Sequence, residues 1–283
     1  MHHVSHTGPN TFGTVTFWEL SAQVDRLACV EAFSAAGFPG LIKERSLPDI
    51  VRAALVQCYE TRGERVIVRS LGRNGGYQVT REDRTGRENQ YRNPVQAMIE
   101  KDVLTILGCE AFGEYSAIES AIEVERLILR PSDTGMALRG AARAIYGASL
   151  RPGGGVYWIP ASGLPKWDLL AGAMQSVGAG KVYVIDHPRD SDSTRAVLDA
   201  VAREALQEIS EIENGTHAEV GERGLQARAQ DARDLTARLA EYEQILGESL
   251  ADLRAQAEKA GNAAATAALL AMATKAQKAR AKA

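Results

Sequence analysis

The stretch that decides the fold lies in the C-terminal third of the chain, at residues 225–260, LQARAQDARDLTARLAEYEQILGESLADLRAQAEKA. Apolar residues recur there at sevenfold spacing, and two more fill intermediate positions of the same stripe. Charged and amide residues occupy most positions between them. A narrow apolar stripe in a charged, alanine-rich segment is typical of a coiled-coil helix. We therefore predict a seam for a partner or a second copy, made of Leu225, Ala232, Leu235, Leu239, Tyr242, Leu246 and Leu253.

A shorter helix is predicted before this one, from Ser193 onward, and Asn214-Gly215-Thr216 ends it. Its apolar residues recur at spacings of four and three, which is also a seam pattern. At 1.5 Å per residue, the helix over 225–260 spans about 54 Å and its predecessor about 30 Å. The shorter helix cannot cover the longer one. The rest of the seam must contact the globular body, a different protein or a second copy, and we favour the second copy.

Together these two helices are predicted to form an antiparallel hairpin, residues 191–262, followed by an alanine-rich basic tail helix, residues 263–283. The tail contains four cations and no acid. It is interpreted either as a segment that binds phosphate or a membrane surface, or as a helix whose cations complement its own C-terminal dipole. We favour the second interpretation because four charges are few for a binding tail.

The preceding part of the chain is predicted to be an α+β body over residues 14–190, with a sub-boundary near residue 130 as an alternative. Residues 1–13 are polar, with Gly and Pro, and are expected to form a flexible arm. Residues 14–100 show a strand, two helices and a small antiparallel meander, and residues 100–129 return to helical spacing. The fold class is therefore α+β: a mixed helix and antiparallel-strand body followed by a long helical hairpin.

An arginine-bearing hairpin in the meander, residues 62–92, raises the hypothesis of nucleic-acid binding. A surface that follows phosphates should carry uncompensated cations, whereas acidic residues interleave with the arginines here. The candidate contacts, taken with the basic tail, are Arg69, Arg73, Arg81, Lys275, Lys278 and Arg280.

A strand–helix–strand unit is predicted from Val156 to Asp186. The glycines of the preceding RPGGG are interpreted as a turn that enters its first strand, because no helix follows them to bind a phosphate. Ligands gather beyond the carboxyl ends of strands in parallel sheets, so Asp186 and His187 are the candidate catalytic pair. The alternative is that the neighbouring acidic and hydroxyl residues cap the next helix, and we favour the cap.

Composition excludes few functions. The 283 residues carry a net charge of −3, which lacks the strong basic excess of a dedicated nucleic-acid binder. Three cysteines without close spacing are expected to be reduced thiols. The sequence predicts no transmembrane helix, no signal peptide, no metal site and no cofactor, and the expected location is the cytoplasm.

Three function classes follow. The preferred one is a non-enzymatic assembly or adaptor protein that uses the C-terminal helices for oligomerisation or partner binding. The second is a nucleic-acid-associated accessory protein that uses the hairpin 62–92 and the basic tail. The third is an enzyme with a site near Asp186 and His187.

Overall fold

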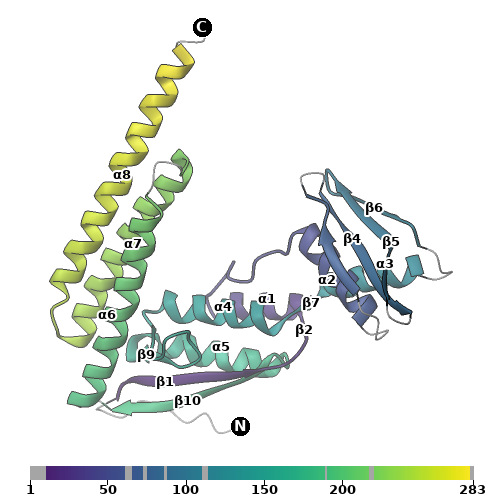
Figure 1. Ribbon diagram of the computed structural model, residues 1–283. Coiled ribbons are helices and arrows are strands. Elements are labelled where there is room, and N and C mark those ends of the chain that lie inside the picture. Colours follow the sequence, from purple (N-terminus) through teal and green to yellow (C-terminus); the bar gives the residue numbers. More distant parts are fainter. Residues whose placement is uncertain are drawn as a thin grey trace. The chain divides into compact units, whose positions relative to one another are not determined.

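The computed structural model describes residues 11–60, 66–72, 75–85, 88–109, 114–188, 190–216 and 220–280. The fold is α+β with antiparallel strand pairing, as the sequence predicts (Figure 1). The chain divides into two compact units, each with its own hydrophobic core. The meander unit comprises the described parts of Leu20–Ala137 and Ala173–Ala179. The bundle unit comprises the described parts of Met1–Glu19, Leu138–Gly172 and Gly180–Ala283.

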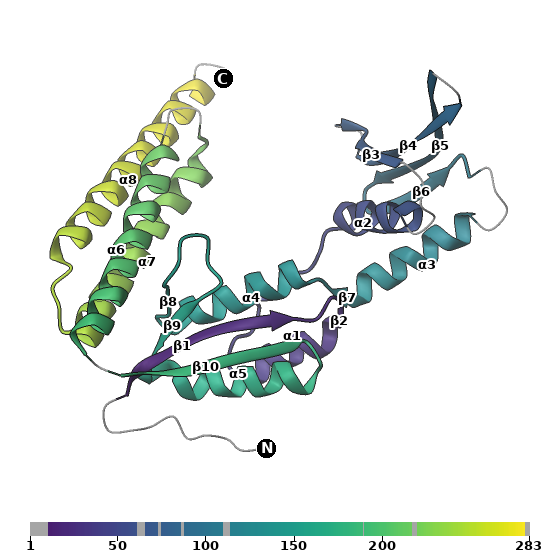
Figure 2. The same ribbon diagram turned by 60° about the horizontal axis from the view of Figure 1, so that its bottom comes forward.

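The meander unit is built on a four-stranded antiparallel sheet whose strands follow one another in chain order. They are β3 (Val66–Ser70), β4 (Gly76–Thr85), β5 (Glu88–Glu100) and β6 (Val103–Leu107). Two helices, α2 (Leu47–Glu60) and α3 (Glu114–Leu127), pack on one face of this sheet (Figure 2). The side chains of β3 alternate between the face that the helices cover and the exposed face. Val66 and Val68 pack against the core, whereas Ile67 is exposed.

Strand β6 corrects the prediction of helical spacing after residue 100. Its apolar residues fit the two-residue period of a strand as well as helical spacing. Leu104 and Ile106 are two residues apart, and both face the core. Pairing with β5, from Gln96↔Leu107 to Glu100↔Val103, supplies the backbone hydrogen bonds of a strand. The short pair β2 (Val24–Asp25) and β7 (Ile128–Leu129) flanks helix α1 (Arg26–Ala35), and helix α4 (Pro131–Ala144) follows β7.

Glu125, on α3, is a fully buried charge in the meander unit. Its carboxylate accepts hydrogen bonds from Arg45 Nη1 at 2.8 Å and from Arg130 Nη2 at 2.6 Å. Burial by itself raises the pKa of a carboxyl group, but the hydrogen bonds and charges of Arg130 and Arg45 outweigh it here, so the pKa of Glu125 is lowered. This ion triad ties the segment before α2, helix α3 and the segment after β7 together.

The sheet of the bundle unit has the strand order β10 (Gly180–Pro188), β1 (Thr11–Leu20), β9 (Tyr157–Pro160) and β8 (Ala148–Ser149). The predicted strand–helix–strand unit is present as β9, helix α5 (Leu164–Ser176) and β10, with a short 3-10 turn before the helix. Strand β1 lies between its two strands (Figure 2). The three glycines before β9 lie in the turn that joins β8 to β9, and all have positive φ angles.

Strand β1 corrects two predicted boundaries. The sequence groups residues from 14 onward with the meander, whereas β1 pairs with β9 in the other unit. Residues 1–10 of the predicted arm lie outside the described residues, but Gly13 is buried within β1. A Cβ atom on Gly13 would lie 2.3 Å from the Ile159 carbonyl oxygen and 2.6 Å from Trp158 Nε1. This glycine therefore permits close strand packing and does not mark a loop.

The C-terminal third of the chain contains helices α6 (Ser191–Asn214), α7 (Glu222–Leu246) and α8 (Ala251–Arg280), whose bounds differ from those of the predicted hairpin and tail helix. The predicted helix over 225–260 ends at Gly247, whose φ of 72° makes a left-handed C-cap. The predicted break at Gly261-Asn262 lies inside α8. A Cβ atom on Gly261 would lie 2.7 Å from the Ala232 side chain, so this glycine lets α7 and α8 approach closely. The predicted boundary at residue 262 therefore falls within a continuous helix.

Replacing Gly247 by alanine should destabilise the bundle unit by about 1–2 kcal/mol, because a Cβ atom is strained in the left-handed region. Gly172 in α5 is the matched control: it has no positive φ and a Cβ atom there meets nothing within 4 Å. Gly172→Ala should raise stability by about 0.5–1 kcal/mol. Urea unfolding followed by tryptophan fluorescence measures both. Equal effects of the two substitutions would contradict the role of Gly247 as the turn.

Candidate functional site

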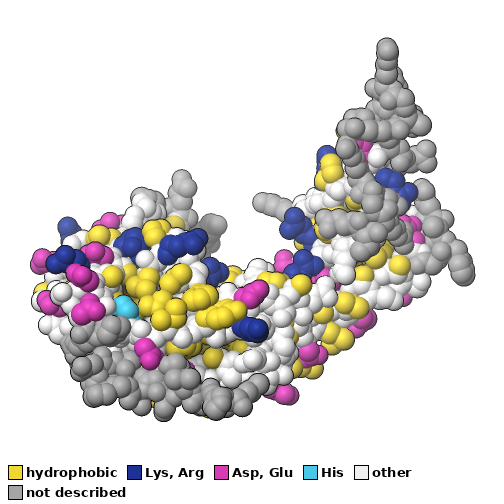
Figure 3. Space-filling model, turned by 90° about the horizontal axis from the view of Figure 1, so that it is seen from below, with side chains coloured by type: hydrophobic (Ala, Val, Ile, Leu, Met, Phe, Trp, Pro, Cys, Tyr) yellow, Lys and Arg dark blue, Asp and Glu magenta, His cyan; other side chains and the backbone are white. Residues whose placement is uncertain are grey.

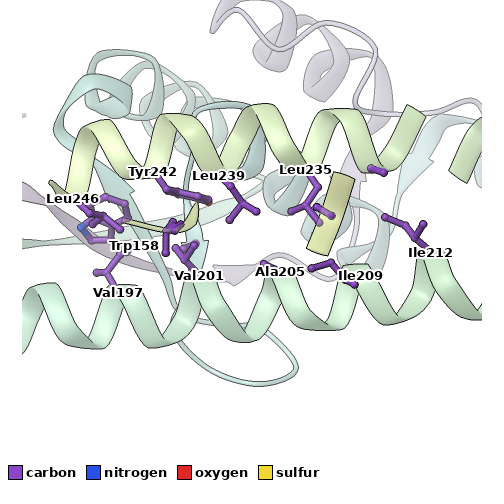
Figure 4. Packing of buried hydrophobic residues seen from close by; sticks show 14 of the residues in the cluster. Trp158, Val197, Val201, Ala205, Ile209, Ile212, Leu235, Leu239, Tyr242 and Leu246 are labelled. Atoms are coloured by element: carbon purple, nitrogen blue, oxygen red, sulfur yellow. The ribbon is translucent and has the colours of Figure 1, made fainter. Parts of the chain in front are cut away.

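The predicted seam lies inside the three-helix bundle of this chain. Six of its seven residues are at most 3 % exposed, and Leu253 is partly buried against the same core. Residues of α6, among them Val201 and Ile209, and the indole of Trp158 pack on them (Figure 4). The premise that a partner must bury the stripe is therefore corrected, because α8 folds back and provides the third helix that the length argument lacked.

Polar contacts at the edge of this bundle join three helices. Glu208 on α6 binds Arg143 of α4 at 2.5 Å and Arg238 of α7 at 2.6 Å. These residues line a charged groove of about 270 Å³. Tyr242 donates a hydrogen bond to the Gly147 carbonyl at 3.1 Å, and burial raises the pKa of its hydroxyl. Glu208 is paired with both arginines, so ion pairing between the helices explains why these charged residues are grouped.

The candidate catalytic pair does not converge on one site. Asp186 and His187 are consecutive in β10, so their side chains point to opposite faces of the sheet. Burial lowers the pKa of His187, while the charge of Asp190 acts in the opposite direction. Asp190 itself caps α6, since its Oδ1 accepts from the Ser193 N–H at 2.7 Å. In the described part of the chain no three His, Cys, Asp or Glu side chains are grouped closely enough to hold a metal ion.

The candidate nucleic-acid contacts are likewise dispersed. Arg69 is exposed on β3, whereas Arg81 pairs with Val66 and lies on the face that the helices cover. Lys275 belongs to the bundle unit, where its Nζ lies 3.6 Å from Glu222. Arg73 lies outside the described residues, and the structure describes Lys278 and Arg280 only as backbone positions of α8. The candidate contacts Arg69 and Arg81 thus lie on different faces of the sheet.

One face of the bundle-unit sheet carries exposed apolar side chains (Figure 3). Phe17 of β1 stacks on Tyr183 of β10 with their ring centroids 4.8 Å apart. Ile185, two residues further along β10, is 55 % exposed. Strand β10 is the last strand on its side of the sheet. This surface, Phe17, Tyr183 and Ile185, is a second place where a partner could dock, and we call it the sheet patch.

Helix α8 carries a more extended apolar surface. Its buried face is a stripe of alanines: Ala257, Ala260, Ala264 and Ala268. Immediately after the last of them, Leu269 and Leu270 are 67 % and 65 % exposed, and Met272 is 44 % exposed. Helix α8 continues past the ends of α6 and α7 (Figure 1). Large apolar side chains thus lie exposed just after the last buried alanine of α8.

A groove of about 530 Å³ lies beside these residues, between α7 and α8. Its lining is dominated by small side chains, among them Ala229, Ala237 and Ala265. Glu258 and Arg233 contribute the charged groups. The groove and the exposed leucines form the candidate interaction surface.

The sequence matches a family of unknown function, DUF6744, over residues 11–278. The chain belongs to this family. The DUF6744 match begins in β1 and ends in α8, so it includes both compact units and the exposed residues of α8. No curated protein and no solved structure matches the chain. No helix in the described part of this DUF6744 member is long and apolar enough to span a bilayer.

Sequence reasoning missed Leu269 and Met272 as surface residues. The run from Ala263 to Met272 is small and apolar, which gave no reason to separate a buried face from an exposed one. The sequence does contain a signal that could have identified the exposed face: the only large apolar side chains of that run are Leu269, Leu270 and Met272.

Proposed function

We propose that this protein is a non-enzymatic assembly protein that associates through its C-terminal helices. The observation that carries the proposal is the exposure of Leu269, Leu270 and Met272, which follow the last buried alanine of α8. An isolated helical segment is marginal in water, and helices in proteins are stabilised mostly by packing of an apolar face. A partner that covers this part of α8 would supply that packing.

The two other hypotheses rank below this one for physical reasons. Arg69 and Arg81 lie on opposite faces of the meander sheet, which weakens the case for a phosphate-binding surface. Asp186 and His187 point to opposite faces of β10, which weakens the case for a catalytic pair. The seam is buried within the chain, so the exposed residues of α8 are the surface that supports assembly.

Leu269→Glu combined with Met272→Glu should weaken self-association at least 100-fold. Burying a Leu or Met side chain stabilises by roughly 1.5–3 kcal/mol, and each 1.4 kcal/mol is tenfold in Kd. Sedimentation velocity over a range of concentrations measures the effect. Far-UV circular dichroism should stay unchanged, because both side chains are exposed and glutamate favours helix about as well as leucine.

Two control variants separate the possible surfaces. Leu206→Glu, on α6, changes another leucine that is 50 % exposed and should leave association intact. Ile185→Glu tests the sheet patch. If Ile185→Glu dissociates the protein and the α8 variant does not, the assembly surface is the sheet patch. A wild-type chain that stays monomeric at the highest concentration reached would overturn self-association.

A further inference from the structure

Strand β6 forms one edge of the meander sheet. It pairs with β5 on one side, and no described strand pairs with it on the other (Figure 1). An exposed edge offers backbone N–H and C=O groups to another strand, and natural proteins usually protect such edges with charged residues or proline. The opposite outer strand, β3, carries Arg69, whereas β6 has neither a charge nor a proline. Strand β6 is therefore the less protected edge of this sheet.

The hydrogen bonds of β5 show which backbone groups of β6 point outward. The Ile99 N–H donates to the Gly75 carbonyl at 2.8 Å, on the side of β5 where β4 lies. In an antiparallel pair, opposite residues alternate between positions that bond each other and positions that bond away from each other. Leu104 lies opposite Ile99, and Ile106 is two residues further along β6. The N–H and C=O groups of Leu104 and Ile106 therefore point to the open edge.

A groove of about 660 Å³ lies beside this edge, between β6 and α3. Its apolar lining comes from Leu104 and Ile106 of the strand and Ile122 of the helix. On the other face of β6, Val103 is 64 % exposed and Leu107 is 48 % exposed. The side chains of a strand alternate between its two faces. A strand added to β6 would therefore cover the groove with one set of side chains and Val103 and Leu107 with the other.

Charge indicates which kind of strand fits the groove. The charged residues that line it are Glu119, Glu123 and Arg126, two carboxylates and one guanidinium, so its net charge is −1. Arg126 lies 3.4 Å from Glu123, and no described cation pairs with Glu119. Glu119 accepts a hydrogen bond from Tyr115 and raises the pKa of that hydroxyl. A second copy would bring the same acidic residues to this edge, whereas a basic side chain would be attracted to Glu119.

We propose that β6 and this groove bind an extended segment of another protein in which apolar residues alternate with Arg or Lys. The segment adds a strand to the sheet, and its backbone bonds to Leu104 and Ile106. Its basic side chains lie on the groove side, where their methylene groups cover the apolar lining and their charged ends reach Glu119. Its apolar side chains cover Val103 and Leu107. The inference goes beyond the proposed function and is independent of it, because β6 belongs to the meander unit and α8 to the bundle unit.

A charge-reversal experiment tests the occupant. The probe is a fluorescein-labelled peptide in which valine and arginine alternate, and fluorescence anisotropy measures its affinity for the full-length protein. It should bind about tenfold more tightly than the same peptide with glutamate in place of arginine, because like charges repel at the groove. Glu119→Lys should abolish this preference. Glu31→Lys, at an exposed position of α1 in the same unit, changes the net charge equally and should preserve it.

A comparison of backbone-methylated probes tests strand addition itself. One probe carries N-methyl groups on all its arginines and the other on all its valines. Only one of these two sets of N–H groups faces β6 in a strand pair, so one probe should bind about tenfold more weakly and the other should bind as before. The inference is overturned if neither methylation weakens binding, or if the valine–arginine peptide binds no better than its glutamate counterpart.

A second copy at β6 is the alternative occupant, and a cysteine variant detects it. Two antiparallel β6 strands centred on Thr105 would place this exposed residue opposite itself. A disulfide-linked dimer of Thr105→Cys under mild oxidation, without one of Ser70→Cys on the opposite outer strand, would overturn the assignment to a basic segment. These results are independent of Leu269→Glu with Met272→Glu, so failure here leaves the proposed function of α8 standing.

Discussion

Replacing Glu125 by alanine should lower the free energy of unfolding of the meander unit by about 3 kcal/mol, because breaking a buried ion pair leaves a partner charge without compensation. Glu125 is fully buried, and its carboxylate receives both Arg45 and Arg130. The expected value lies at the lower end of the range of about 3–5 kcal/mol for buried pairs, since the two arginine side chains keep some access to water.

Glu123→Ala is the matched control for this substitution. Glu123 lies two residues earlier on α3, and its carboxylate is 3.4 Å from Arg126 in a pair that is largely exposed. Exposed pairs contribute about 0–1 kcal/mol, so this variant should remain close to wild type. All three tryptophans, Trp18, Trp158 and Trp167, belong to the bundle unit, so the meander unit is followed by far-UV circular dichroism in urea. Equal midpoints for the two variants would contradict the role assigned to the triad.

The same triad predicts a pH dependence. The pKa of Glu125 is lowered in the folded protein, so its contribution is fully present above the unfolded pKa of about 4.3 and is lost as the pH falls through the folded pKa. The difference in unfolding free energy between wild type and Glu125→Gln should therefore shrink as the pH falls from 7 into the acid range. A difference that is constant over this range would show that the charge of Glu125 contributes nothing.

Local patterns in the sequence predict most elements of this fold. The meander, the strand–helix–strand unit and the helix that starts near Ser193 all follow from apolar periodicity and turn residues. What the sequence does not reveal is the long-range pairing. Strand β1 pairs with β9, which lies about 140 residues later, and no local pattern distinguishes that partner from the nearby meander. Contacts at such separation depend on which surfaces fit together as the bundle unit folds.

Glycine is the other reason why some predicted element boundaries differ from the structure, because it has three different structural roles here. Gly247 ends a helix with a positive φ angle, yet the apolar spacing from Leu246 to Leu253 continues across it and conceals the turn. Gly261 is followed by Asn, which resembles a helix end, yet it lies inside α8 against α7. Gly13 resembles a loop residue and is a buried strand position. The sequence alone does not distinguish a glycine that is needed for a positive φ angle from one that lets two elements pack closely.

The candidate surface shows the same limit. Sequence periodicity identified a stripe on α7 and correctly marked it as apolar, but it could not say whether the covering helix came from this chain or another. The sequence analysis did not predict the turn at Gly247, which reverses the chain so that α8 packs on α7. Because α8 covers the seam, the exposed apolar side chains of this region are Leu269 and Met272 and not those of the seam.

Leu239→Ala should destabilise the bundle unit by about 2–5 kcal/mol, the range for removing a leucine side chain from a packed core. Leu239 is fully buried and belongs to the cluster that joins α6, α7, α8 and Trp158 (Figure 4). Leu206→Ala on α6 is the control, because the same atoms are removed from a side chain that is half exposed. Its effect should stay within about 0.5 kcal/mol. Tryptophan fluorescence in urea measures both.

The dependence of this effect on protein concentration separates an internal seam from an intermolecular one. If Leu239 packs inside its own chain, the loss of stability is the same at low and high concentrations. If it packed against a second copy, the substitution would act through dissociation, and the unfolding midpoint of the wild type would rise with concentration while that of Leu239→Ala would not. The buried position of Leu239 among α6 and α8 predicts the first result. Because Leu269→Glu with Met272→Glu should change association and not the midpoint of the monomer, the two experiments together assign the two stripes to their separate roles.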